Sequence, residues 1–322
     1  MRRRTLAAAF GGVLALPALV RAQRKPMPTV GLLASVGLAR TGEHLTGIRQ
    51  GLGDAGYVEG DALALEYRSA EGVYGRLPGM AADLVARKVD VIIAQGPPAA
   101  RTAKAATTTL PIVFGVGVDP VAEGLVASLA RPGGNLTGVT LLSSELTAKR
   151  FALLLELAPE ARLIALLVNP TVANPWIGGV EDLARARGVR LLMAKASNPS
   201  EIDAAFATIA REHAEALVLG EDTFLATRQQ IAELALRHRL PSISLLRSYA
   251  ELGGLVSYGA NLTAAYRQIG AMAGRILKGA NPADLAVQQP IKFETVLNLK
   301  TARAIGLEIA PLVLAQADEV IE

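Results

Sequence analysis

Polar and glycine-containing segments follow several apolar runs of the sequence, at the point where each run ends. Two stand early in the chain, at 34–37 (Ala-Ser-Val-Gly) and 95–98 (Gln-Gly-Pro-Pro), and others stand at 116–119, 143–144, 169–170, 220–222 and 247–249. They supply hydroxyls, amides, a few charges and the free N–H groups of helix starts. Because the carboxyl ends of parallel strands meet at one edge of a sheet, these segments predict a shared polar site for a small ligand. Each segment by itself is also typical of a helix cap.

The sequence contains no pattern typical of catalysis or of metal binding. Residues 51–56 (Gly-Leu-Gly-Asp-Ala-Gly) have the spacing of a dinucleotide-binding loop, but they follow a helical pattern and predict a helix end. His44, His213 and His238 have no second ligand at metal spacing, and cysteine is absent from the sequence. We therefore expect no enzyme, no cofactor and no metal site.

The basic charge belongs to the N-terminus. The formal charge is +4, and residues 1–22 hold four arginines and no acid, so the rest of the chain has 29 basic and 29 acidic residues. An apolar run from Leu6 to Val20 and a small-residue pattern ending at Ala22 are typical of a signal peptide. We expect cleavage after Ala22 and a periplasmic protein without a lipid anchor. The neutral remainder argues against a nucleic-acid partner, and the choice between Sec and twin-arginine export stays open.

Short β-rich runs alternate with helical patterns from Pro28 onward. Strands are expected at 29–33, 62–67, 89–94, 111–115, 137–141, 162–168, 189–194, 216–219, 241–245 and 254–258. The spacing of most of them is that of βα units, which indicates parallel sheets. So many strands exceed one doubly wound sheet, so we expect an α/β protein of two lobes.

Six stretches of the sequence carry a resemblance to a known family: 56–60 (GYVEG), 105–114 (AATTTLPIVF), 128–138 (SLARPGGNLTG), 257–262 (SYGANL), 289–294 (QPIKFE) and 298–307 (NLKTARAIGL). In them the chain resembles bacterial ABC-transporter substrate-binding proteins of the type I periplasmic binding fold, in the branch with tryptophan- and phenylalanine-binding members. The resemblance implies two Rossmann-like lobes joined by three crossover strands, with lobe I at 28–141 plus 259–286 and lobe II at 142–258 plus 287–322.

The same resemblance implies a function. It predicts an extracytoplasmic, monomeric solute-binding component of an ABC transporter, which binds an amino acid or a related carboxylate between its lobes by hinge closure. The implied partners are an integral-membrane permease and a cytoplasmic ATPase. A ligand-presenting sensor protein and a secreted α/β enzyme remain as alternatives.

The expected ligand site combines the loops with aromatic side chains. We expect the ligand's carboxylate at Ser35 and at the backbone of 96–99, because a helix start offers free N–H groups and partial positive charge. The resemblance assigns Asp222 to the ligand's ammonium. Aromatic residues are expected to line the pocket for the ligand's side chain. The loop at 95–98 departs from the hydroxyl-rich loop of aromatic amino-acid binders, so the sequence does not decide which side chain the ligand carries. The complete predicted set is Ser35, Gln95, Gly96, Pro97, Ala99, Asp119, Ser143, Asn169, Trp176, Asp222, Phe224, Arg247, Tyr249 and Tyr258.

Overall fold

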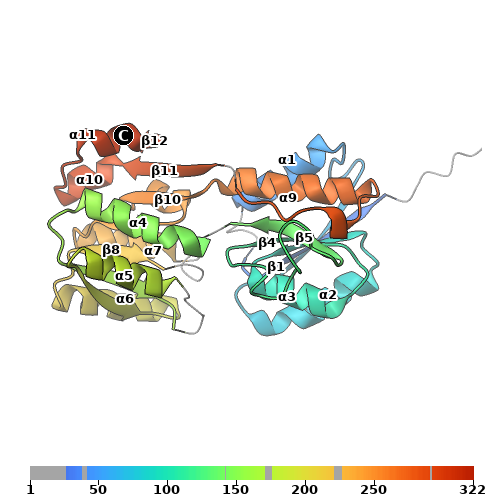
Figure 1. The fold of residues 1–322 in the computed structure, drawn as a ribbon, viewed down its shortest axis with the longest axis horizontal. Helices are drawn as coiled ribbons and strands as arrows, with labels where there is room; N and C mark the ends of the chain where they lie inside the picture. Colours follow the sequence, from blue (N-terminus) through green and yellow to red (C-terminus); the bar gives the residue numbers. More distant parts are fainter. Residues whose placement is uncertain (1–26, 38–41, 142, 171–175, 221–226, 291) are drawn as a thin grey trace, which may run out of the picture.

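A computed structural model gives the architecture of the chain. It describes residues 27–37, 42–141, 143–170, 176–220, 227–290 and 292–322, without the side chains of 143–145, and the structural statements below concern these residues. They form two α/β lobes that lie side by side, each built around its own β-sheet (Figure 1).

The first sheet has five parallel strands in the order β2-β1-β3-β4-β5. Its strands are β1 (Thr29–Ala34), β2 (Ala64–Ser69), β3 (Val91–Gln95), β4 (Ile112–Val116) and β5 (Leu136–Thr140). Helices α1 (Gly42–Asp54) and α9 (Leu262–Leu277) pack on one face, and α2 (Leu77–Ala86) and α3 (Pro97–Ala106) pack on the other. Coverage on both faces explains why β3 and β4 are buried at every position.

The second sheet has seven strands in the order β12-β11-β10-β9-β8-β6-β7. They are β6 (Leu163–Val168), β7 (Arg190–Lys195), β8 (Ala216–Leu219), β9 (Ser242–Ser244), β10 (Val256–Ala260), β11 (Phe293–Asn298) and β12 (Glu319–Ile321). All neighbours are parallel except β10 and β11, which are antiparallel.

Helices also cover both faces of the second sheet. One face carries α4 (Ser143–Leu157), α5 (Ile177–Ala186), α10 (Leu299–Ile305) and α11 (Pro311–Gln316). The other carries α6 (Pro199–Arg211), α7 (Arg228–Arg237) and α8 (Arg247–Glu251). The predicted α/β class with two parallel-strand lobes is confirmed.

The chain passes between the lobes at three places, from β5 to α4, from β10 to α9, and from residue 288 to β11. Gln288 still lies beside the first sheet, where it forms a bridge with Val139, and β11 begins at Phe293 in the second. All ten expected strands are present, and β11 and β12 are two strands that the sequence patterns did not predict.

Glycines set the close packing of α1 against α9. A β-carbon on Gly51 would lie 1.9 Å from the carbonyl oxygen of Arg267, and one on Gly270 would lie 2.2 Å from the carbonyl oxygen of Ile48. Helix α1 ends at Asp54, and Gly56 follows with a φ of 88°. The glycines of 51–56 therefore belong to a helix contact and a helix end, as expected, and not to a strand–helix phosphate loop.

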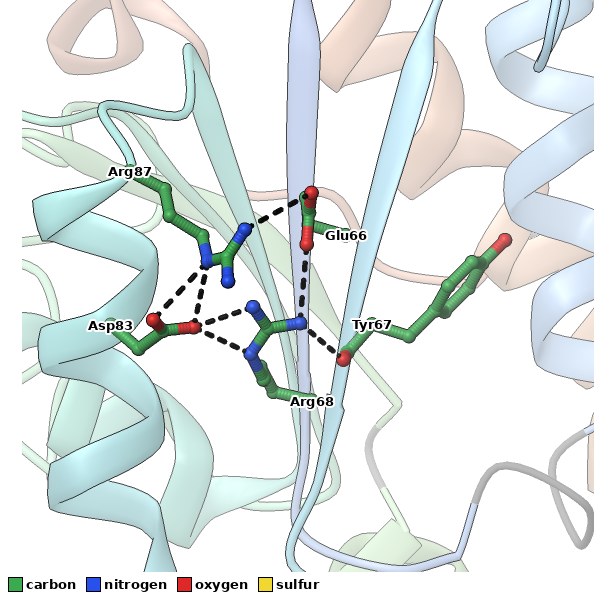
Figure 2. A network of polar contacts seen from close by, with 5 residues as sticks. All are labelled: Glu66, Tyr67, Arg68, Asp83 and Arg87. Carbon is green, nitrogen blue, oxygen red and sulfur yellow. Dashed lines mark hydrogen bonds and ion pairs between the residues drawn. The ribbon is translucent and has the colours of Figure 1, made fainter.

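Ion pairs tie the edge strand β2 to helix α2. The Arg68 guanidinium donates to Asp83 at 2.7 Å and to Glu66 at 3.2 Å, and Arg87 bridges to the same two acids (Figure 2). The Arg68 side chain is one-fifth exposed, and two of its nitrogens donate hydrogen bonds to the Asp83 carboxylate. Because β2 has a partner strand on one side only, this network fixes the free edge of the first sheet.

Candidate functional site

The two loops that were expected to begin the site do lie together. In the strand order β2-β1-β3, strands β1 and β3 are neighbours, and the connections after them lead to opposite faces of the sheet. Such a position is the topological switch point, where parallel α/β sheets bind ligands. Ser35 follows β1 directly, and Gln95 is the last residue of β3.

Ser35, Gln95, Gly96, Pro97 and Ala99 form one continuous contact at this point. The Ser35 N–H donates to the Gln95 carbonyl at 3.1 Å, and the Ser35 hydroxyl accepts the Ala99 N–H at 3.1 Å. Gly96 has a φ of 89° and a ψ of 155°, a conformation that glycine alone adopts readily. A β-carbon there would lie 3.1 Å from Ser35 Oγ, so glycine also makes room for the serine.

The main-chain donors expected to hold a carboxylate are already occupied or missing. The Gly96 N–H donates to the Gly115 carbonyl at 2.9 Å, and the Ala99 N–H donates to Ser35. Pro97 and Pro98 have no N–H group. The backbone of 96–99 therefore has no free donor, which argues against the expected main-chain cradle for a carboxylate. The Ser35 hydroxyl proton and the Gln95 amide are the donors that remain.

The Gln95 side chain is buried and lacks partners. It is 3% exposed, and within the described part of the chain neither its amide nitrogen nor its amide oxygen has a hydrogen-bond partner. Strand alternation puts it on the face of α1 and α9, since Val91 and Ile93 pack there while Ile92 and Ala94 pack against α2 and α3.

His44 and Tyr266, which were not among the predicted site residues, lie at the same place. Gly115 pairs with Gln95 across β3 and β4, and a β-carbon on Gly115 would lie 3.3 Å from the Tyr266 hydroxyl. The Tyr266 ring stacks on His44, with ring centroids 3.9 Å apart and planes at 17°. His44 lies in the first turn of α1 and Tyr266 in the second turn of α9, so only the α1–α9 packing reveals their contact.

Both of these side chains are uncharged near neutral pH. Burial, together with the positive charge of Arg228, lowers the pKa of His44 to about 3. Burial raises the pKa of Tyr266 well above its usual value, without any hydrogen bond that shifts it. Glu43, next to His44, has a raised pKa because it is partly buried and lies near Glu251 of α8. Its other charged neighbours are Arg228, Arg247 and Glu294, all from the second lobe.

Among the second-lobe candidates, Asn169, Trp176 and Tyr258 lie at or beside the described ends of strands. Asn169 follows β6 and is 1% exposed. Trp176 is packed in the core over Gly220, where a β-carbon would meet its ring at 3.1 Å. Tyr258, within β10, lies next to Phe293 with ring centroids 6.5 Å apart.

Three other candidates have local structural partners. Arg247 pairs with Glu251 at 2.7 Å and with Glu319 at 2.6 Å, which raises its pKa. Tyr249 is fully buried in the second-lobe core, and its hydroxyl is 2.7 Å from Ser242 Oγ. Asp119 accepts the N–H of Val121 at 2.8 Å in an exposed turn. Tyr249 thus belongs to the second-lobe core and Asp119 to a turn, whereas Arg247 is also a charged neighbour of Glu43, next to His44.

The remaining predicted residues cannot be placed. Asp222 and Phe224 lie outside the described residues, and Ser143 begins α4 with its side chain outside them. Of the residues described, no three histidines or acids gather as a metal cluster. Within the same residues no helix combines the length and the apolar character that crossing a membrane requires.

Comparison with known proteins places this architecture. A curated relative, the tyrosine-binding protein of Clostridioides difficile (strain R20291), is 25% identical over 85% of this chain and 81% of its own length. A conserved domain protein of Vibrio cholerae is 28% identical, with a TM-score of 0.84 over 91% of this chain and 99% of its own. An ABC domain in complex with L-Trp from Streptococcus pneumonia is 25% identical, with a TM-score of 0.81 over the same shares.

The family model agrees with these relatives and with the two-lobed fold. It matches residues 30–321, which include every described strand except the first residue of β1. The resemblance found in the sequence is confirmed: the chain belongs to the family of ABC transporter substrate-binding proteins.

Proposed function

We propose that the protein binds an amino acid or a related small carboxylate between its two lobes, and that the lobes close on it about a hinge. The observation that carries the proposal is the family match over 30–321, joined to two similar proteins whose descriptions name L-Trp and tyrosine. The polar residues at the end of the first sheet support it, because a small ligand needs a few convergent polar groups in an otherwise apolar setting.

We further propose that lobe I comprises 28–141 and 259–286, and lobe II 142–258 and 287–322. The three passages of the chain support these limits, although Gln288 still pairs beside the first sheet. Asp222 is proposed as the partner of a ligand ammonium. A buried ammonium that loses its only carboxylate typically costs roughly 2–5 kcal/mol of affinity.

The protein is proposed to act after export, with residues 1–22 removed as a signal peptide. A monomer would then deliver its ligand to an integral-membrane permease driven by a cytoplasmic ATPase. The absence of cysteine from the whole sequence supports a form without an N-terminal lipid.

The test is to identify what the protein binds. Mass spectrometry of protein purified without denaturation is expected to identify one bound small carboxylate. Calorimetric titration with the twenty amino acids is expected to show that the same compound binds at one site per chain. Stoichiometric binding without turnover is expected. Conversion of the ligand to a product would favour an enzyme instead.

A further inference from the structure

Three uncharged polar side chains meet at the carboxyl edge of the first sheet, and we call them the His44–Gln95–Tyr266 cluster. Gln95 ends β3, and the Tyr266 hydroxyl lies over Gly115, the β4 residue that pairs with Gln95. His44 is stacked face to face on the Tyr266 ring. All three are at least nine-tenths buried.

The cluster carries more hydrogen-bonding capacity than the described residues satisfy. Both amide atoms of Gln95 and the Nδ1 atom of His44 are buried without a partner in the described part of the chain. A buried polar group left unpaired typically costs about 1–3 kcal/mol, and more than about nine in ten such groups in proteins have a partner. Several orphaned atoms in one place therefore indicate a missing partner.

Small residues flank Gln95 on both neighbouring strands. Its neighbours in register are Ala34 on β1 and Gly115 on β4, the two smallest residue types. A β-carbon at 115 would lie 2.7 Å from Ile269 and 3.3 Å from the Tyr266 ring and hydroxyl. Because position 115 is glycine, Ile269 and Tyr266 can pack directly onto the sheet, and this close approach places the Tyr266 hydroxyl beside the strand position paired with Gln95.

The hydrogen-bond donors of the cluster favour an anion. A carboxylate only accepts hydrogen bonds, and the cluster can offer the Gln95 NH2 group, the Tyr266 O–H and one N–H of His44. The charge that acts on His44 is that of Arg228, from helix α7 of the second lobe, and it is positive.

We propose that His44, Gln95 and Tyr266 form the first-lobe subsite for the ligand's carboxylate, in place of the main-chain N–H groups at the start of α3. This inference rests on the proposed function, and it names the side chains that decide which ligands the first lobe accepts. The Ser35 hydroxyl borders the subsite, since Ser35 contacts the main chain of Gln95.

The experiment compares two variants with two classes of probe. Gln95→Leu removes the amide at nearly constant volume, and Tyr266→Phe removes one hydroxyl while the stack on His44 stays. Calorimetry measures the binding of the twenty amino acids, including L-tryptophan and L-tyrosine, and then of the amine that lacks the carboxylate of the best binder, such as tryptamine or tyramine. Gln316→Leu, an exposed glutamine of α11, and Tyr57→Phe, beyond the far end of α1, are the matched controls.

We expect Gln95→Leu to weaken the amino acid at least tenfold and Tyr266→Phe about fivefold or more, with both controls unchanged. The amine is expected to bind all five proteins with equal weakness, because it has no carboxylate for the subsite to recognise. Gln95→Leu should also keep or raise the urea midpoint, since it removes an unpaired polar group. A stability gain with an affinity loss separates a ligand role from a structural one.

Three results would overturn the inference in different ways. If an amino acid binds and both variants bind it as tightly as the wild type, the subsite is wrong while amino-acid binding stands. If the variants weaken the amine as much as the amino acid, the cluster does not recognise a carboxylate. If none of the twenty amino acids binds the wild-type protein, the proposed function fails in its amino-acid form, and the subsite fails with it.

Discussion

The side-chain amide of Asn261 donates a hydrogen bond to Glu294 at 2.9 Å, and this contact joins two of the three passages between the lobes. The side-chain oxygen Oδ1 of Asn261 accepts the Ala264 N–H at 2.8 Å and so caps α9. The Asn261 N–H donates to the carbonyl of Lys292, just before β11. One residue thus holds the start of a first-lobe helix and the start of a second-lobe strand.

Asn261→Ala is expected to destabilise the protein more than the loss of an ordinary helix cap. Asn198→Ala is the matched control, because Asn198 also caps a helix, α6, and also donates its amide to a carboxylate, that of Glu201 at 2.8 Å, but in an exposed contact within one lobe. Loss of a cap costs about 1 kcal/mol in either helix, and loss of the part-buried bond to Glu294 adds roughly 1.5–3 kcal/mol, more than loss of the exposed bond to Glu201. Urea unfolding measures both variants. Equal losses would mean that the Glu294 contact contributes no more to stability than the exposed contact to Glu201.

Gly96→Ala is expected to lower the free energy of unfolding by more than Gly56→Ala. Both glycines have a positive φ, near 89° and 88°, but a β-carbon at Gly56 meets nothing within 4 Å, while one at Gly96 meets Ser35. Alanine at position 56 costs about 1 kcal/mol. Alanine at position 96 costs roughly 1–3 kcal/mol through backbone strain, and the contact with Ser35 adds to this cost. Thermal unfolding of both variants tests the difference, and a Gly96→Ala protein as stable as Gly56→Ala would contradict it.

Acid is expected to destabilise the protein through His44. Its pKa is near 6.5 when unfolded and about 3 in the fold, so the unfolded chain binds the extra proton between these values. This contribution to stability is complete above about pH 6.5 and is lost progressively as the pH falls towards 3. Glu43, whose pKa is raised, acts in the opposite direction.

The measurement is the free energy of unfolding in urea at several pH values between 7 and 3.5. His44→Phe keeps the ring stack on Tyr266 and is expected to flatten the pH dependence. The exposed His213 supplies the control, and His213→Gln is expected to leave the slope unchanged. A wild-type slope that persists in His44→Phe would assign the acid sensitivity to other groups.

Trp176 is expected to report ligand binding by fluorescence. It is the sole tryptophan of the chain, is 6% exposed, and packs over Gly220, which immediately precedes the proposed ammonium loop. Movement at 220 changes the contacts of the indole ring, so saturation with a ligand identified by calorimetry should shift its emission. Trp176→Phe supplies the background. An unchanged spectrum at saturation would remove Trp176 from the ligand site.

Most of the fold was predictable because buried strands and helix faces have recognisable patterns of apolar residues in the sequence. Strands such as β3 and β6, covered on both faces, are continuous apolar runs. β11 alternates part-buried and buried positions over its first four residues and pairs antiparallel with β10, so its pattern differs from the runs before it. β12 has three residues, too few for any periodicity to show.

The sequence predicted that Ser35 and Gln95 lie together in the candidate site, and it did not predict which hydrogen-bond donors are free there. The rule that ligands bind at strand ends led to Ser35 and Gln95, and the register of β1 and β3 brings them together. The hydrogen bond from Ala99 to Ser35 joins residues 64 positions apart, and no local sequence pattern predicts it. His44 and Tyr266 sit in helices that become neighbours only through glycine-mediated packing. By contrast, the absence of two N–H groups could be read from the sequence, because Pro97 and Pro98 are prolines.

The paired prolines at the start of α3 have an evolutionary consequence. A binding site built from main-chain N–H groups depends little on the identity of the side chains, and among single substitutions proline alone removes such a donor. Where proline removes those groups, recognition passes to side chains, and each of these can be exchanged by a single codon change. With the proposed subsite, the ligand preference of the first lobe would change by exchange of side chains while the backbone stays fixed.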